Sequence, residues 1–470
     1  MRQCIKIACW CIGLLSFAGR GYAQRCFGVA NSEWSSMNSI WLNPASIAGS
    51  NEKITISIGA INIGIDNSFG TFNLASAGNA FNGSGAGSSG FFSNSGRSVF
   101  SMLLPVAEIR GPGVLVRIND RQSIALTTRI RVMNQLNNFD QSLYTTLTNT
   151  SYLPGNTFSL KAKNFNWTAD LWSELGLTYG VILADNPNGQ LKAGITLRYL
   201  GGIGYLSLKG NNLDLNYMAG KDSLYVSNSD LQYSSDIIST RSAVFNGINA
   251  SGLFGSFLGT GKGGGLGGDI GLIYAMNPRR RDIYTDDNKS YSLKLSASVT
   301  DIGAITYNAK NNATVNVTGN GYITGKGIKD NTKNATNFKN YIIGQGFTAD
   351  TTSQAAKVYL PSALLLGADY NVYKKLYVNA TYVANLVNRQ NFGNSYYNQV
   401  TITPRYDTKL LTIGLPITYS MLANVVKVGF GFRVAGFFAG SDDMLAIFSQ
   451  QYGFGFYFGG YIPIYYKGKL

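Results

Sequence analysis

Apolar and polar residues alternate along many segments of the chain, which is the pattern of antiparallel strands with two different faces. In 190–199, one face carries Leu, Ala, Ile, Leu and Tyr, and the opposite face carries Lys, Gly, Thr and Arg. The same alternation is clear in 291–299 and 426–434. It recurs in 173–183, 375–385 and 411–419. The sequence therefore predicts an all-β protein.

Both soluble sandwiches and membrane barrels show such alternation. Three features favour the barrel. Tyr and Phe gather near the ends of the apolar faces, as in an interfacial girdle, and the opposite faces are rich in Gly, Ser and Thr, as in a wet lumen. The alternating runs also reach about 9–11 residues, the length of a tilted membrane strand, whereas soluble strands most often have about 5–6. We therefore expect an antiparallel transmembrane β-barrel rather than a soluble secreted β-protein.

The alternation predicts about 14 strands, within a range of about 12–16, and bacterial barrels have even numbers of strands. The predicted strands are 53–65, 98–107, 112–119, 121–133, 173–184, 190–203, 267–277, 291–302, 361–371, 375–386, 397–406, 408–420, 425–439 and 452–464.

Connections of two lengths separate these strands. Short turns are indicated at Tyr373-Lys374, Asp407 and Leu422-Ala423-Asn424. Residues 205–263 and 303–358 are long and polar, and 134–170 form a third long connection. Because outer-membrane barrels have short periplasmic turns and longer external loops, we expect 205–263 and 303–358 to lie outside the cell.

The N-terminus has the features of a secretory signal peptide. Arg2 and Lys6 form a basic start, an apolar stretch follows from 7 to 17, and small residues precede a cleavage site after Ala23. The next segment, 24–52, shows neither alternation nor a helical face. We therefore expect a signal peptide (1–23), a plug-like segment inside the lumen (24–52) and a barrel (53–470).

Cleavage after Ala23 changes both the cysteine count and the charge. Of four cysteines only Cys26 remains, so no intramolecular disulfide is expected. Three basic residues are lost, which lowers the formal charge from +15 to +12. The remaining basic residues are scattered, with Arg279-Arg280-Arg281 as the single run of three, so we expect no nucleic-acid partner.

Composition supports strands that cross a membrane. Charged residues make up 13% of the chain, against about 25% in soluble domains. No later segment has the roughly 18 unbroken apolar residues of a membrane helix.

Catalytic chemistry is poorly represented. The chain has no histidine, which removes Ser-His-Asp and Cys-His arrangements and the commonest metal ligand. The adjacent pairs Asp286-Asp287 and Asp442-Asp443 are best interpreted as loop carboxylates, because neighbours on a strand point to opposite faces. The glycine-rich stretch 259–265 lacks the spacing and the Ser or Thr of a phosphate-binding loop. We therefore expect no enzyme, no cofactor, no metal and no catalytic residues.

Basic residues recur on the polar faces of the predicted strands, where Glu174 and Asp269 also lie. One interpretation is a basic lumen that favours anionic solutes or head groups. The other is structural, because Lys or Arg at the lipid midplane costs about 2–4 kcal/mol, so any charge in a barrel wall has to face inward. The residues concerned are Arg129, Arg131, Lys192, Arg198, Lys294, Lys427 and Arg433.

Several motifs resemble known outer-membrane families. Ile40-Trp41-Leu42-Asn43-Pro44-Ala45, before the first strand, resembles the Asn-Pro-Ala signature of the long-chain fatty-acid transporter superfamily, and Val299-Thr300-Asp301-Ile302-Gly303 recurs in the same group. The C-terminal third resembles an uncharacterised family of Gram-negative outer-membrane barrels, a domain of unknown function. Its motifs here are Leu360-Pro361, Pro404-Arg405-Tyr406, Leu415-Pro416-Ile417 and Phe437-Phe438-Ala439-Gly440-Ser441-Asp442. The transporter resemblance implies a barrel of 14 strands with an N-terminal hatch, and identifies Asn43, Pro44 and Ala45 as a plug motif.

Two functions remain open for such a barrel in the cell outer membrane. One is passive transport of a small hydrophobic or amphiphilic molecule, including an anionic one. The other is a binding or scaffold barrel that serves a secretion or surface-assembly complex through its long loops. The expected partners are outer-membrane lipid and either a small amphiphilic solute or secretion and surface-assembly proteins.

Overall fold

The computed structural model describes residues 25–76, 92–94, 96–141, 157–217, 223–235, 257, 262–278, 291–307, 314–331, 335–352, 356–388 and 393–466. The predicted signal peptide, the arginine run 279–281 and the pair 286–287 lie outside the described residues.

Within this part of the chain, fourteen antiparallel strand positions close into one barrel, which confirms the predicted fold class. The first and last strands form the seam, with register from Ile54 opposite Ile464 to Asp66 opposite Gly453. In ring order the wall strands are β1 (Ile54–Asn67), β4 with β5 (Val99–Arg110, Gly113–Arg117), β6 (Gln122–Asp140), β7 (Phe158–Asn186), β8 (Gly189–Tyr217), β10 (Gly263–Met276), β11 (Leu293–Tyr307), β14 with β15 (Lys357–Tyr359, Ala363–Tyr373), β16 (Leu376–Asn385), β17 (Gln399–Asp407), β18 with β19 (Leu411–Gly414, Ile417–Ser420), β20 with β21 (Val425–Val428, Phe430–Val434), β22 (Phe437–Ser441) and β23 (Gly453–Ile464).

The strand number agrees with the sequence prediction because two errors in it cancel. The predicted strands 98–107 and 112–119 are one wall position, since β4 and β5 both pair with β1 and with β6. The predicted strand 425–439 is two positions, because the chain turns at Ala435, whose φ is 52°, and β22 then pairs with β21. Pro112 lies between β4 and β5 and lacks the backbone N–H that would donate to a neighbouring strand, so this wall position is interrupted there.

The outer face of the wall is apolar and exposed. Along β7 and β8, for example, Leu177, Leu183 and Leu197 point outward, and Leu197 is 62% exposed. Exposed tyrosines lie near one end of the wall strands, at Tyr179, Tyr274, Tyr370, Tyr373 and Tyr406. An exposed apolar surface of this kind marks a site of contact with a membrane or with another protein.

The two ends of the barrel differ in the length of their connections. At one end, here the turn end, the links are short: 187–188, 374–375, 408–410 and 435–436. At the other, the loop end, the long connections begin after β6, β8 and β11. The link between β10 and β11 is an exception at the turn end, and most of it lies outside the described residues.

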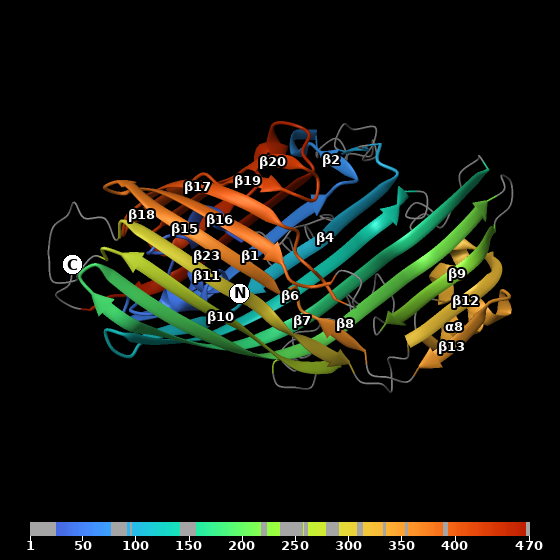
Figure 1. Cartoon of the computed structure of the whole chain (residues 1–470), viewed down its shortest axis with the longest axis horizontal. Helices are drawn as coiled ribbons and strands as arrows, with labels where there is room; N and C mark the ends of the chain where they lie inside the picture. Colours follow the sequence, from blue (N-terminus) through green and yellow to red (C-terminus); the bar gives the residue numbers. More distant parts are fainter. Residues whose placement is uncertain are drawn as a thin grey trace, which may run out of the picture.

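The long segments 205–263 and 303–358 are not simple loops, which corrects the sequence prediction. β8 continues to Tyr217, and β9 (Leu224–Ser235), β12 (Thr314–Ile323) and β13 (Thr348–Thr352) extend the sheet beyond the barrel. This extension lies at the loop end with α7 (Gly325–Asn331) and α8 (Ala335–Gly344) (Figure 1). Similarly, much of 134–170 is strand, because β6 reaches Asp140 and β7 begins at Phe158.

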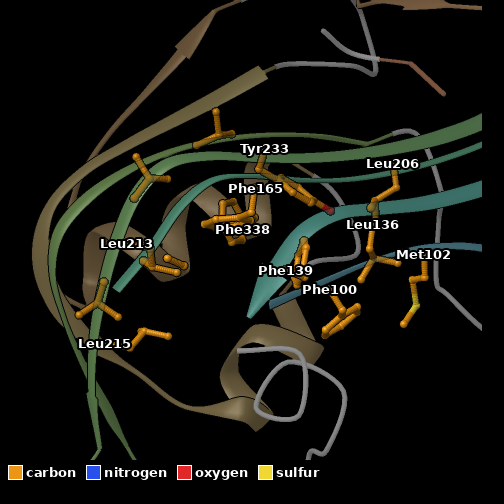
Figure 2. Close-up of a cluster of buried hydrophobic side chains, with 14 of the residues drawn as sticks. Phe100, Met102, Leu136, Phe139, Phe165, Leu206, Leu213, Leu215, Tyr233 and Phe338 are labelled. Carbon is orange, nitrogen blue, oxygen red and sulfur yellow. The ribbon is translucent and has the colours of Figure 1, made fainter. Parts of the chain in front are cut away.

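The interior at the loop end is apolar. Side chains from β4, β6, β7, β8 and β9 converge on Phe338 of α8 (Figure 2). Phe139 contacts Phe165 edge to face, with 5.2 Å between ring centroids, and Tyr233 lies 4.5 Å from Phe338. The extension and the loop end of the barrel therefore share one buried core.

Small elements complete the loop end: β2 (Gly70–Phe72), β3 (Phe92–Asn94), η3 (Leu74–Ser76) and η5 (Leu445–Ile447). None of the helices among the described residues is long and apolar enough to cross a membrane.

Candidate functional site: the lumen and the N-terminal segment

Residues Arg25–Glu52, here the N-terminal segment, pack inside the ring of strands. They form three short helices, α2 (Phe27–Ala30), η1 (Ser36–Trp41) and η2 (Pro44–Ile47), where the sequence suggested irregular structure. All four residues of α2 are buried. Phe27 and Val29 share an apolar cluster with Leu365 of β15 and Val383 of β16.

Glycines on the inner face of the wall let this segment approach the strands closely. A Cβ at Gly194 of β8 would lie 2.3 Å from Ala45 N, and a Cβ at Gly414 of β18 would lie 2.2 Å from Gly28 O. These are contacts that no larger residue allows without displacing the segment. Glycine at these positions therefore leaves the space that the backbone of the N-terminal segment occupies against the wall.

The motif Asn43-Pro44-Ala45 lies against β8, β10 and β11. Asn43 caps η2, because its Oδ1 accepts from Ala45 N at 2.9 Å. Its Nδ2 donates to Leu272 O at 3.0 Å and Ala297 O at 3.2 Å, which belong to paired residues of β10 and β11. One asparagine thus connects the N-terminal segment to two neighbouring strands.

An ion-pair cluster occupies the lumen beside this segment. Every side chain in it is at most 7% exposed. Arg129 Nη2 donates to Glu174 Oε2 at 2.6 Å, and Arg198 Nη1 donates to Asp269 Oδ1 at 2.8 Å. The members are four arginines and four carboxylates, so their formal charges cancel: Arg110, Arg129, Arg131, Arg198, Glu108, Glu174, Asp269 and Asp301.

Asp301 is the shared acceptor of this cluster. Its Oδ1 lies 3.2 Å from Arg129, 3.0 Å from Arg131 and 3.3 Å from Arg198. The backbone of Asp301 has a φ of 57°, and the register of β10 with β11 shifts opposite it. This bulge reverses the inward phase of β11, because a slip of one residue exchanges the two faces of a strand.

Trp41 of the N-terminal segment lies among the arginines. Its ring centroid is 4.2 Å from Arg129 Cζ, 5.2 Å from Arg110 Cζ and 5.7 Å from Arg198 Cζ. Guanidinium groups over an indole face are attracted by the ring quadrupole. The cluster therefore holds the segment as well as the wall.

A second charged group lies toward the turn end. Lys294 Nζ is 2.7 Å from Glu33 Oε1 and 3.7 Å from Asp369, and Arg405 lies 3.0 Å from the same aspartate. Burial by itself would raise the pKa of Glu33, but the charges of Lys294 and Lys192 outweigh it and lower the pKa to about 2. Glu33 is therefore ionised and tied to the wall.

The other two predicted basic residues also have partners. Lys427 Nζ lies 3.0 Å from Asp66 Oδ1 and 3.7 Å from Asp443. Arg433 donates to Thr412 Oγ1 at 2.8 Å and to backbone carbonyls, including Ala435 O at 2.8 Å. Three of the seven predicted residues thus share the large cluster (Arg129, Arg131 and Arg198), two lie near Glu33 (Lys192 and Lys294), and two lie apart (Lys427 and Arg433).

The start of the N-terminal segment faces an aspartate of the link between β22 and β23. The backbone amides of Arg25–Gly28 point to the carboxylate of Asp442. Burial raises the pKa of Asp442 to about 7, and these amides oppose the shift. Asp443, beside it, also has a pKa raised to about 7 by burial. Asp442 therefore belongs to the docking of α2, whereas Asp443 lies 3.7 Å from Lys427, and both side chains are buried rather than solvated.

The roles of several of these residues are not evident from the sequence. Alternation places Asp301 on the lipid face, and only the local Asp-x-Gly bulge, with Gly303 at a φ of 137°, brings it inward. Glu108 and Arg110 share one strand face, but they lie beyond the predicted end of that strand at 107. Trp41 lies within the motif 40–45, but nothing in the local pattern signals its arginine contacts.

A small pocket lies where the wall is interrupted. Met37 and Trp41 line it from inside, and Gly59, Gly111 and Thr128 line it from the wall. The register of β1 with β23 shifts between Ser57 and Gly59, next to the break between β4 and β5. Among the described residues, no group of three or more His, Cys, Asp or Glu is placed to hold a metal ion.

The fold and lumen define a closed barrel of 14 strands with a filled interior. The chain belongs to the family of unknown function DUF5723, whose model matches residues 44–442. This confirms the resemblance drawn from the C-terminal motifs. No curated protein matches the chain.

Solved structures similar to this chain include several outer-membrane channels. A deltaS2S3 variant of TodX, a monoaromatic hydrocarbon channel, is 10% identical and covers 94% of this chain and 98% of its own, with a TM-score of 0.43. The Ralstonia pickettii toluene transporter TbuX is 10% identical and covers 96% and 100%, with a TM-score of 0.41. A Pseudomonas aeruginosa FadL homologue is 11% identical and covers 94% and 99%, with a TM-score of 0.24.

Proposed function

We propose that the protein is an outer-membrane barrel that passes a small hydrophobic or amphiphilic molecule passively, with the N-terminal segment as its plug. The exposed apolar outer face supports the membrane location, since leucines such as Leu197 and Leu266 would otherwise face water at 62% and 76% exposure. Polar residues take over on the part of β7 and β8 that extends past the wall, as at Lys161, Lys163 and Asn211.

The single observation that carries the proposal is the packing of the N-terminal segment inside the ring. A short chain segment, linked to the wall at one end, fills the lumen. Its backbone lies close against glycines of the wall, and its Asn43 donates hydrogen bonds to two wall strands. A wall built for structure alone would need side chains of its own at these positions rather than glycines. This arrangement supports a removable or rearranging obstruction.

The pairing of charges supports a solute without strong negative charge. Each basic residue predicted to line the lumen either lies beside carboxylates or donates to carbonyls and hydroxyls. An ion pair presents a weak field at a distance, and salt screens it within about 10 Å at 0.1 M. We therefore favour a neutral or amphiphilic solute over an anion.

The test compares the full mature chain with a variant that lacks residues 24–50, in planar bilayers and in intact Gram-negative cells. Removing the plug should raise conductance, and cells should take up the hydrophobic fluorescent probe N-phenyl-1-naphthylamine faster. Heat-modifiable migration on gels verifies that both proteins are folded and equally abundant in the outer membrane.

A folded deletion variant with unchanged conductance and unchanged probe uptake would contradict a plugged transport barrel. That result would favour the scaffold role, for which the sheet extension at the loop end would be the contact surface.

A further inference from the structure

The connection between β16 and β17 enters the lumen. Residues Gly393–Asn398, here the crossing segment, follow β16 at the loop end, where an ordinary loop would lie over the rim. Asn394 and Ser395 are each 1% exposed, and Tyr397 is 8% exposed. The crossing segment is therefore buried within the barrel.

Its hydrogen-bond partners lie on the opposite wall. Ser395 N donates to Gln135 Oε1 at 2.7 Å, and Gln135 Nε2 donates back to Ser395 O at 3.0 Å. Tyr397 OH donates to Asn137 Oδ1 at 2.7 Å. In the ring of fourteen, β6 is the third wall position and β17 the tenth, so seven steps separate them in either direction. The segment thus spans the lumen from one wall to the other.

Tyr396 joins the crossing segment to the ion-pair cluster. Arg131 Nη2 donates to the hydroxyl of Tyr396, and this hydroxyl lies 3.2 Å from Asp301 Oδ2. The ring of Tyr396 also packs against the apolar residues around Phe27 and those around Trp172.

The same tyrosine contacts the N-terminal segment. Arg25 Cζ lies 4.2 Å from the centroid of the Tyr396 ring, within the range of a cation–π contact. Arg25 is the first described residue of the segment, and among the described residues Tyr396 is the aromatic ring that contacts its guanidinium. Tyr396 is therefore the point at which the two obstructions of the lumen meet.

We propose that the crossing segment is a second barrier on the loop side of the plug, coupled to it through Tyr396 and Arg25. This rests on the proposed transport function and concerns its regulation. The crossing segment is held to β6 by neutral hydrogen bonds at Gln135 and Asn137 and by one charge-assisted bond, from Arg131 to Tyr396. The plug is held by the Glu33–Lys294 ion pair, by three guanidinium groups around Trp41 and by close backbone contacts with wall glycines. Because the crossing segment has fewer contacts with charged groups, it leaves its wall first, and its departure removes the contact with Arg25.

The test fixes the crossing segment to β6 with a disulfide. Gln135→Cys and Ser395→Cys are introduced together in the full chain, with Cys26→Ser to remove the buried free thiol. Uptake of N-phenyl-1-naphthylamine by intact cells is measured before and after a reductant is added. We expect uptake by the oxidised protein to be lower by about tenfold or more, because a covalent bond removes the open state instead of shifting its population. Reduction should restore it.

A matched control places a disulfide within the wall. Thr178 and Thr196 face each other on β7 and β8, with 2.9 Å between their hydroxyl oxygens, so Thr178→Cys with Thr196→Cys constrains no barrier. Uptake by this variant should be the same in both redox states. Equal uptake by the oxidised and reduced 135–395 variant, with the bond verified by mass spectrometry, would overturn the second barrier alone. Uptake by the parent chain no faster than by cells without it would overturn transport, and the barrier with it.

A second set of variants tests the coupling without a disulfide. Tyr396→Phe keeps the ring over Arg25 and loses the hydroxyl, whereas Tyr396→Ala loses both. We expect Tyr396→Ala to raise uptake more than Tyr396→Phe, and Arg25→Ala to add little in the Tyr396→Ala background, because contacting residues are not additive. Fully additive effects of Arg25→Ala and Tyr396→Ala would show that the two segments move independently.

Discussion

Trp41 and Arg129 are in direct contact across the boundary between the N-terminal segment and the barrel wall, with 4.2 Å between the guanidinium carbon and the ring centroid. Arg129 at the same time pairs with Glu174 and Asp301. Arg129 therefore neutralises carboxylates of the wall and also holds the N-terminal segment in the lumen.

Replacing Trp41 by Leu should loosen the N-terminal segment without unfolding the barrel. A desolvated cation–π contact contributes up to about 2 kcal/mol, and Trp41→Phe should keep part of it. Limited proteolysis of the folded protein would measure the effect, as faster cleavage within 25–52 in Trp41→Leu than in Trp41→Phe. Equal cleavage of both variants and the parent chain would contradict the contact as an anchor.

Removal of the Asp301 carboxylate should destabilise the barrel itself. Asp301→Ala leaves three arginines short of an acceptor, and breaking one partner out of a buried ion pair costs about 3–5 kcal/mol. The midpoint of urea unfolding, followed by the loss of heat-modifiable migration, should fall accordingly. Asp350→Ala, at an exposed position of β13, is the matched control and should leave the midpoint unchanged.

A side chain at Gly194 should displace the Asn-Pro-Ala motif. A Cβ there would lie 2.3 Å from Ala45 N, so Gly194→Val has to push η2 away from β8. We expect higher conductance in planar bilayers. Gly264→Ala is the control, since its Cβ would meet no atom closer than 3.6 Å. Higher conductance from both variants would indicate general damage rather than loss of docking.

Docking of α2 should weaken as the pH rises toward neutrality. Burial raises the pKa of Asp442 from 3.8 to about 7, so its contribution to docking is complete below about pH 4 and is lost as the pH rises through about 7. Hydrogen exchange of the amides of 25–30 between pH 4 and 8 would follow this change. Asp442→Asn should reduce the pH dependence, because the amide stays neutral, and Asp230→Asn, exposed on β9, should not.

Ion selectivity should be weak. The sequence suggests anion preference from basic residues that line the lumen, but Lys294 and Lys427 each lie within 3.0 Å of a carboxylate oxygen. Reversal potentials under a KCl gradient should lie near zero for the variant that lacks residues 24–50. A small deviation is expected from Lys294, because this deletion removes its partner Glu33. Strong anion selectivity that Lys427→Gln abolishes would instead assign the basic residues to the permeation path.

The sequence predicts the barrel well because its strands must present one face to lipid and the other to the interior, and this requirement acts on every second residue. It fails where that rule is locally broken. Asp301 lies at a bulge that exchanges the faces of β11, so period-two alternation assigns it to the wrong side. The break at Gly111-Pro112 divides one strand into what looks like two.

Contacts across the lumen are harder to predict. The partners of Tyr396 are Arg131, Asp301 and Arg25, which lie 265, 95 and 371 positions away in the chain. Their meeting depends on the order and closure of fourteen strands, and no local pattern encodes it. Likewise, the glycines of the inner wall read as ordinary small lumenal residues until the N-terminal segment is placed against them.

The seam between β1 and β23 has a consequence for biogenesis. β23 contacts the N-terminal segment, because Tyr461 OH donates to Trp34 O at 2.6 Å and Tyr457 packs in the same apolar cluster as Phe27. Such a long sequence separation makes ring closure a slow, late step. A chain whose N-terminal segment is wrongly placed therefore offers β23 an incomplete surface at the moment of closure.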